Sequence, residues 1–278
     1  MSNRSTRARI GRRVMVHMPV GGSRSVMMGA VAAVTLATLV TGCGGKSQDH
    51  PSSSAAGNPA VGKLPQATTF ANLKNVPKDS GADAAGNGTV AHPTAAVPVS
   101  ATPGGPPVAT LPDKELGGPT WVPVVETKPG WQRVLLPSRP NGATGWIPAG
   151  KMQTAHSSYV VKVDTSARRL SLLKSGQSLG TWTVAVGAPK TPTPAGRTFI
   201  MASLAPAKAT YSPLILPVGA HSESLDTYGG GPGTVAFHGW PQKSVFGQAV
   251  THGCVRVPAD ALQQLAKVPL GTPVSISN

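Results

Sequence analysis

The stretch FHGWPQKSVFGQAVTHGCVRV, residues 237–257, brings the most reactive side chains of the chain into a short span. It contains His238, His252 and Cys254, and Cys254 is one of only two cysteines in 278 residues. A free thiol has a pKa of about 8.5, so little of it is nucleophilic thiolate at neutral pH, and an adjacent imidazole raises that fraction. The residues admit three interpretations of Cys254: a buried packing residue, a metal ligand, or a nucleophile for acyl transfer.

The neighbouring residues favour the nucleophile. Gly253 allows a sharp turn and the close approach of a substrate carbonyl, and the backbone N–H of Cys254 is a candidate donor to an oxyanion. A zinc site is disfavoured because two histidines and one cysteine lack a fourth ligand or a Cys-x-x-Cys pair. The base stays open between His238 and His252, since His252 shares a face with Cys254 if the chain is extended there.

The same stretch resembles the active-site signature of L,D-transpeptidases with a YkuD-type catalytic domain. That signature is a His-Gly pair, an intervening segment, and then Ser/Thr-His-Gly-Cys, a hydrophobic residue and Arg or Asn. HG at 238–239 and THGCVR at 251–256 match it in order and spacing. VDTSARRLSLLKSG, GAPKTPTPAGRTFI and YGGGPGTVAFHG upstream also look like parts of this domain, so the resemblance covers about residues 158–278.

The resemblance implies a β-sandwich-like fold and acyl transfer on peptidoglycan stem peptides, with no cofactor and no metal. In the family the Cys attacks the bond after the third residue of a tetrapeptide stem, releases D-Ala and forms a thioester. An amine of a neighbouring stem then resolves the thioester as a 3-3 cross-link. Carried over residue by residue, Cys254 is the nucleophile and His238 is the base, oriented by the Gly239 carbonyl. His252 and Gly253 support the catalytic turn.

The residues that we expect to bind substrate are Thr251, Arg256, Trp240 and Tyr228. Arg256 suits a carboxylate of the donor stem. Trp240 stands after His-Gly where smaller or polar residues are usual, and is expected to narrow the acceptor side or stack against its occupant. Two milder departures from the family pattern are Thr251, which keeps the hydroxyl of the commoner Ser, and Val257, which replaces a bulkier hydrophobe. Tyr228 and the glycine-rich run 229–233 form a loop beside the site, either a lid or a plain connection.

Hydrophobic periodicity predicts a mainly β fold with one short helix. Residues 158–164 alternate as a half-buried strand, and residues 167–181 predict a hairpin with its turn at 174–177. Further strands are expected at 180–186, 234–238 and 274–276. The helix is expected at 259–267, with Leu262 and Leu265 facing inward.

The composition changes twice before this catalytic domain, which is expected over residues 155–278. Residues 107–154 hold short β-prone runs around Trp121, Trp131 and Trp146, separated by Gly- and Pro-containing turns, and resemble bacterial SH3-like modules. Residues 43–106 are rich in Ala, Gly, Pro, Ser and Thr without sustained periodicity, so a disordered tether is expected.

Residues 1–42 are expected to be a lipoprotein signal peptide. Six arginines and no acid precede an apolar run from Val26 to Val40, which is short for a membrane span. VTGC at 40–43 resembles the bacterial lipobox, so we expect Cys43 to be lipidated and the protein to be anchored to the outer face of the cell membrane. An incidental Cys at a cleavage site and an uncleaved anchor are the alternatives, and Arg12-Arg13 leaves twin-arginine export open.

The chain is basic, with a formal charge of +15 that falls to +9 without the six leader arginines. These cations are scattered rather than interleaved with aromatics, which disfavours a nucleic-acid partner and suits an anionic wall or lipid headgroups. We therefore expect a lipid-anchored, extracytoplasmic L,D-transpeptidase that faces the cell wall, with carbapenem-type β-lactams as inhibitors. The competing interpretation is a non-catalytic lipoprotein that only binds peptidoglycan.

Overall fold

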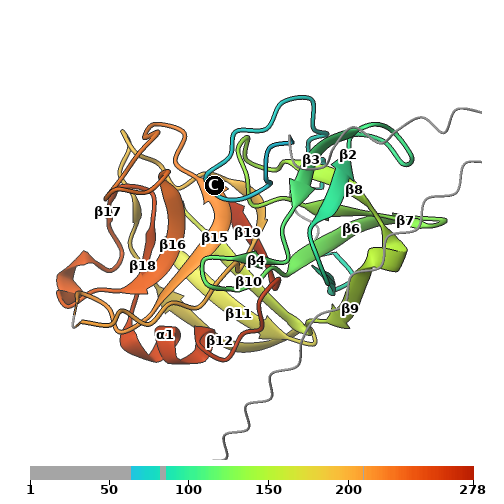
Figure 1. Cartoon of the computed structure of the whole chain (residues 1–278). Helices are drawn as coiled ribbons and strands as arrows, with labels where there is room; N and C mark the ends of the chain where they lie inside the picture. Colours follow the sequence, from blue (N-terminus) through green and yellow to red (C-terminus); the bar gives the residue numbers. More distant parts are fainter. Residues whose placement is uncertain (1–63, 82–85, 209) are drawn as a thin grey trace, which may run out of the picture. The chain divides into compact units, whose positions relative to one another are not determined.

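The computed structural model describes residues 64–81, 86–208 and 210–278. The expected signal peptide, the expected lipidation of Cys43 and the tether residues 43–63 lie outside the described residues. Strands dominate the described part (Figure 1). Its single α-helix is α1 (Ala259–Leu265), and two short 3-10 helices are η2 (Ala149–Lys151) and η3 (Lys243–Val245). No helix of this part is long and apolar enough to cross a membrane.

The first half of the described chain builds a seven-stranded sheet in the order β3-β2-β8-β7-β6-β1-β9. Its strands are β1 (Thr89–Pro93), β2 (Val97–Ser100), β3 (Pro107–Leu111), β6 (Val122–Lys128), β7 (Trp131–Leu135), β8 (Thr144–Pro148) and β9 (Met152–His156). The short strands β4 (Lys114–Glu115) and β5 (Gly118–Pro119) pair separately. Leu111, Val134 and Ile147 lie in the core of this half. Strands therefore occupy the predicted β-prone runs, and the SH3-like interpretation of residues 107–154 stays a prediction.

The tether predicted over residues 43–106 is wrong for residues 64–81 and 86–106. Strands β1 and β2 fall within that range, and Ala67 and Leu73 are buried in the same core as the sheet. The Ala67 N–H donates to the Thr110 carbonyl, which ties the segment to β3. Small apolar residues carry little local periodicity, so only partners distant in sequence give this segment its order.

The second half contains two main sheets that enclose one core. A five-stranded sheet has the order β12-β11-β10-β19-β14, and a three-stranded sheet has the order β15-β16-β18. The first comprises β10 (Tyr159–Asp164), β11 (Arg169–Lys174), β12 (Gln177–Thr183), β14 (Gly196–Phe199) and β19 (Pro273–Ser277). The second comprises β15 (Ile215–His221), β16 (Thr234–Gly239) and β18 (Val255–Val257), and β13 (Val186–Gly187) pairs with β17 (Ala249–Thr251).

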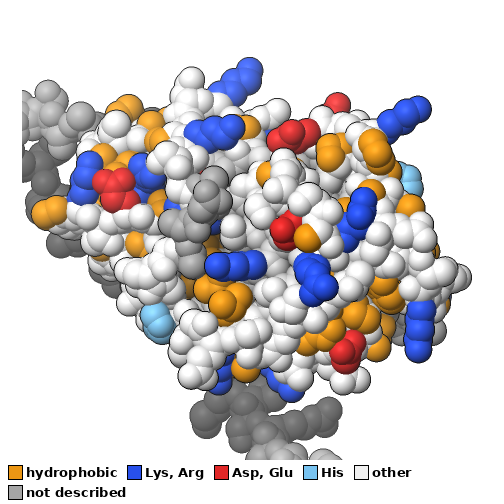
Figure 2. All heavy atoms as spheres, turned by 180° about the vertical axis from the view of Figure 1, so that it is seen from behind, with side chains coloured by type: hydrophobic (Ala, Val, Ile, Leu, Met, Phe, Trp, Pro, Cys, Tyr) orange, Lys and Arg blue, Asp and Glu red, His pale blue; other side chains and the backbone are white. Residues whose placement is uncertain are grey.

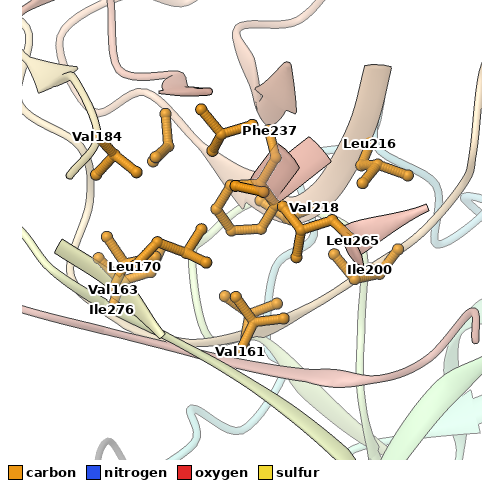
Figure 3. Packing of buried hydrophobic residues seen from close by; sticks show 14 of the residues in the cluster. Val161, Val163, Leu170, Val184, Ile200, Leu216, Val218, Phe237, Leu265 and Ile276 are labelled. Atoms are coloured by element: carbon orange, nitrogen blue, oxygen red, sulfur yellow. The ribbon is translucent and has the colours of Figure 1, made fainter. Parts of the chain in front are cut away.

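The core between these sheets follows from the alternation of residues along each strand. Phe237 of β16 lies between Leu170 of β11 and Val218 of β15 (Figure 3). Leu262 and Leu265 of α1 join the same core, as the helix prediction required. The predicted turn at 174–177 is also present, because Lys174 pairs with Gln177 across β11 and β12. The mainly β, sandwich-like prediction is thereby confirmed.

The surface charge of the described residues is dispersed on the face opposite to that of Figure 1. Lys and Arg side chains stand singly or in small groups among uncharged residues on this face (Figure 2). This arrangement agrees with the scatter of basic residues along the sequence.

Candidate active site

The parallel pairing of β16 with β18 brings the signature residues together. Phe237 pairs with Val255, and His238 pairs with Arg256. Phe237 and Val255 are buried in the core, so His238 and Arg256 project from the opposite face of the sheet. Cys254 directly precedes β18 and lies two residues before Arg256, which places it on that second face as well.

A cavity of 610 Å³ opens on this face of the sheet. It is lined by seven of the residues singled out from the sequence: Tyr228, His238, Trp240, Thr251, His252, Cys254 and Arg256. Gly239 and Gly253 do not line it, but each adjoins a residue that does. Ile215 and Pro217 of β15 form the floor beside His238, because they pair with His238 and Ala236. The predicted site residues within the described chain therefore gather around one cavity.

One hydrogen bond determines the tautomer of His238. Its Nδ1 lies 2.8 Å from the Gly239 carbonyl oxygen. A carbonyl only accepts, so Nδ1 carries the proton and Nε2 keeps a lone pair. Gly239 is held in turn by its N–H, which donates to Ser212 Oγ at 2.7 Å, while Ser212 Oγ donates to the Leu214 carbonyl at 2.6 Å. The contact expected between His238 and Gly239 is present, with Ser212 as a support that the sequence did not indicate.

The turn that carries Cys254 is held by two buried threonines. Thr251 Oγ1 accepts the Gly253 N–H at 3.1 Å and donates to the Cys254 carbonyl at 2.5 Å. Thr193 Oγ1 donates to the Gly253 carbonyl at 2.9 Å. Gly253 itself has a φ of 117°, a conformation that side chains with a Cβ rarely adopt. Hydroxyl groups and a glycine therefore fix the backbone on which the thiol is presented.

Burial keeps both members of the Cys254–His238 pair neutral. Desolvation raises the pKa of the Cys254 thiol, and a hydrogen bond from the Ala236 backbone and the charge of Arg256 oppose it more weakly. Desolvation also lowers the pKa of His238 below its ordinary value, against the effect of the Gly239 hydrogen bond. The sequence suggested neighbours that enrich the thiolate, but it does not show the desolvation that favours the uncharged thiol.

Aromatic side chains form the walls of the cavity. The guanidinium of Arg256 lies 3.6 Å from the ring centroid of Trp240. Tyr211 packs edge-on against His238, with ring centroids 4.9 Å apart, and also contacts Trp240. On the other side, Tyr228 stacks on His252 at 4.7 Å. Sequence reasoning missed Tyr211, because an isolated aromatic in a Ser- and Pro-containing segment gives no periodic signal.

The described residues contain no group of three or more His, Cys, Asp or Glu side chains placed to hold a metal ion.

A second, apolar groove of 350 Å³ adjoins the cavity and shares Tyr211 and Trp240 as walls. These two aromatics therefore stand between the cavity that contains Cys254 and the groove against α1.

One protein-family model matches the second half of the chain. Residues 158–276 match the L,D-transpeptidase catalytic domain, YkuD. The matched range includes every residue described above as lining the cavity. It also agrees with the range over which the sequence resembles this family. A comparison with curated proteins gave no match.

Solved L,D-transpeptidases are similar to this chain at low identity. An L,D-transpeptidase from Mycobacterium smegmatis is 17% identical, with 56% of this chain and 82% of that chain covered and a TM-score of 0.37. The catalytic domain of an E. faecium L,D-transpeptidase is 20% identical, with 43% and 97% covered and a TM-score of 0.35. L,D-transpeptidase 3 from Mycobacterium tuberculosis, in complex with a faropenem-derived adduct, is 15% identical, with 50% and 75% covered and a TM-score of 0.37.

Proposed function

We propose that this protein is an extracytoplasmic L,D-transpeptidase that cross-links peptidoglycan stems through a thioester on Cys254. The observation that supports this most is the bond from His238 Nδ1 to the Gly239 carbonyl. It leaves Nε2 able to accept a proton on the face of β16 and β18 where Cys254 lies. A half-buried thiol and an imidazole of that tautomer, both lining one cavity, are the minimum set for acyl transfer.

The first half-reaction would form the thioester. Nε2 of His238 takes the Cys254 proton as Sγ attacks the carbonyl carbon of the third residue of the stem. The backbone N–H of Cys254 donates to the oxyanion that forms. When the intermediate collapses, the C–N bond breaks and D-Ala leaves with the proton held by His238. Because both groups rest neutral, the proton transfer accompanies the attack.

The second half-reaction would transfer the acyl group. An amine of a neighbouring stem attacks the thioester carbonyl and gives one proton to His238 Nε2. The C–S bond then breaks, the amide of the 3-3 cross-link forms, and Cys254 regains its proton. Water in place of the amine would release a free carboxylate, which is the carboxypeptidase outcome.

Arg256 is proposed to bind a carboxylate of the donor stem. Its guanidinium carbon lies 3.6 Å from the Trp240 ring centroid, and its Nε is buried without a hydrogen-bond partner among the described residues. A buried donor that lacks a partner is costly, and a substrate carboxylate would supply the acceptor. The stacked Trp240 fixes the plane of the guanidinium and would narrow the acceptor side of the cavity.

The proposed setting is the outer face of the cell membrane, with Cys43 as the lipid-bearing residue and the catalytic domain facing the wall. Replacement of Cys43 by Ala should move the protein from the membrane fraction to the soluble fraction. Retention of the Cys43→Ala variant in the membrane would show that another feature anchors the chain.

The enzymatic proposal is tested by labelling and by product analysis. The full chain treated with a carbapenem should gain one covalent adduct, mapped to Cys254 by peptide mass spectrometry, and Cys254→Ala should gain none. Cells that express the wild type should contain 3-3 cross-linked muropeptides that are missing with Cys254→Ala.

A purely tethering lipoprotein would behave differently. Wild type and Cys254→Ser would then bind insoluble peptidoglycan equally and leave the muropeptide composition unchanged. Equal labelling of wild type and Cys254→Ala would also overturn the thioester mechanism.

A further inference from the structure

The loop between β15 and β16 supplies one wall of the cavity, and a backbone bond from the Ser222 N–H to the Gly233 carbonyl at 2.9 Å closes its base. Tyr228 and Gly229 of this loop line the cavity, and the Tyr228 ring stacks on His252. Within the loop, the backbone of Tyr228 exchanges two hydrogen bonds with Gly231, at 2.9 and 3.0 Å. Tyr228 is 52% exposed, so packing alone does not fix the wall that it forms.

Arg139 of the N-terminal half reaches this loop and joins its two ends. The residue lies between β7 and β8, and its Nη1 donates to the Ser222 carbonyl at 2.9 Å. Its Nη2 donates to the Pro232 carbonyl at 2.9 Å and to the Leu225 carbonyl at 3.2 Å. One guanidinium therefore bonds the start, the first half and the end of the loop. All three acceptors are backbone carbonyls, so the contact fixes the path of the chain itself.

Two further observations indicate that this contact is tightly fitted. A Cβ at Gly233 would lie 2.5 Å from the Leu225 carbonyl oxygen and 3.1 Å from Arg139 Nη2, so the loop approaches the guanidinium as closely as a glycine permits. The backbone of Arg139 is itself anchored, since its N–H donates to the Ala71 carbonyl at 2.9 Å and its carbonyl accepts from Leu73 at 2.8 Å.

Asn141 reinforces the same junction from the same turn. Its Nδ2 donates to the His221 carbonyl at 2.8 Å, and its Oδ1 accepts the His221 N–H at 2.8 Å. The last residue of β15 is thereby held just before the loop begins. Two side chains of one turn in the N-terminal half thus add to the Ser222–Gly233 backbone bond in holding both ends of the loop that carries Tyr228.

We propose that Arg139 is a positioning residue that holds the Tyr228 wall of the active site in its substrate-binding arrangement. This inference rests on the proposed function of the cavity. His238 lies on β16 and Cys254 directly before β18, whereas the Arg139 guanidinium donates only to carbonyls of the loop, so the intrinsic reactivity of His238 and Cys254 should be independent of it. Arg139 would act on how well a stem peptide or a carbapenem is held, and not on the chemical step.

The test uses the full chain as wild type, Arg139→Met, Arg139→Lys and the control Arg133→Met. Arg133 is an arginine of the same sheet that pairs with Glu126 at 3.1 Å. Acylation of Cys254 is followed against carbapenem concentration, and alkylation by iodoacetamide reports the reactivity of the thiol alone. Arg139→Met should raise the half-saturating carbapenem concentration about tenfold. Its limiting rate and its alkylation rate should stay within about twofold of the wild type.

The conservative variant and a double variant sharpen the result. The half-saturating carbapenem concentration of Arg139→Lys should lie between those of Arg139→Met and the wild type. An ammonium group cannot donate to three separated carbonyls in the fixed geometry of a guanidinium. Tyr228→Ala should reproduce the rise in half-saturation, and adding Arg139→Met to it should give little further change. Arg133→Met should match the wild type.

Two results would overturn the inference. One is an unchanged half-saturating concentration in Arg139→Met, and the other is an equal slowing of alkylation and acylation, which would indicate a general loss of structure. Hydrogen exchange of residues 222–233 gives a readout that does not depend on catalysis. It should rise in Arg139→Met and not in Arg133→Met. A wild type that carbapenems do not acylate would overturn the proposed function, while this exchange measurement would still decide the role of Arg139.

Discussion

Replacement of Thr251 by Val should damage both the stability of the protein and the placement of its thiol. Val keeps the shape of Thr but removes the hydroxyl that bridges the Gly253 N–H and the Cys254 carbonyl. Thr251 is 2% exposed, so water does not readily replace the lost partner. Thr251→Ser is the matched control, because it keeps the hydroxyl and loses only a methyl group.

The magnitude follows from the two hydrogen bonds. Each contributes about 1 kcal/mol net, and a buried N–H left without a partner costs about 1–3 kcal/mol. The free energy of unfolding should therefore fall by about 2–4 kcal/mol in Thr251→Val. Loss of one buried methyl in Thr251→Ser should cost about 1 kcal/mol. Loss of the bridge should also let the Cys254 backbone shift by a fraction of an ångström. Because the thiol is then misplaced relative to the substrate carbonyl, acylation of Thr251→Val should be about 10- to 100-fold slower.

Urea unfolding and carbapenem acylation, measured on the same three proteins, check both numbers. The free energy of unfolding and the acylation rate of Thr251→Ser should both lie near those of the wild type. Both should be well below the wild-type values in Thr251→Val. If Thr251→Val and Thr251→Ser behaved alike, the Thr251 hydroxyl would not be what holds the turn that carries Cys254.

Three further predictions follow from burial and charge. Because burial raises the pKa of Cys254, its alkylation by iodoacetamide should still be increasing above pH 9, and a plateau below pH 8 would contradict this. Burial raises the pKa of Glu115 from 4.5 to about 7, so the stability it contributes is full below pH 4.5 and is lost as the pH rises through 7. Glu115→Gln should remove a decline of about 3 kcal/mol between pH 5 and 8 in urea unfolding, and an unchanged slope would count against it. The pKa of His221 is lowered to about 4, so the protein loses stability at this residue as the pH falls below 6.5. The wild type and Glu115→Gln must therefore be compared at the same pH values. Arg197 and Asp79 form a buried ion pair at 2.6 Å, so Arg197→Met should cost about 3–5 kcal/mol by thermal or urea unfolding, whereas a loss under about 1 kcal/mol would show that the pair is dispensable.

Local patterns in the sequence account for the parts of the fold that are stabilised locally. Residues 158–164 and 167–181 form the strand and the hairpin that their sequence predicted. The signature predicted that His238 and Cys254 belong to one site. The spacing between them reflects the parallel register of β16 and β18, which brings residue 238 opposite residue 256. A fixed motif therefore carries information about a contact that is not local.

Contacts between distant segments account for what the sequence did not predict. Ala67 and Leu73 are ordered only because strands from far along the chain cover them. Tyr211 reaches His238 from an irregular segment, and Arg139 reaches the Tyr228 loop from a turn that looked like an ordinary connection. A local sequence pattern cannot predict such contacts, because they form only when segments distant in sequence pack against each other in the folded protein.

The alternation of side chains along the two strands that carry the site limits which sequence changes the site can tolerate. On β16 and β18 the even-numbered positions face the cavity and the odd-numbered positions face the core. Substitutions at 236 or 256 therefore change the lining of the cavity and leave the side chains of the core between the sheets unchanged. Insertion or deletion of one residue in β16 would exchange the two faces, turning Phe237 into the chamber and His238 into the hydrocarbon interior. The site can therefore tolerate substitutions on these strands but not insertions or deletions.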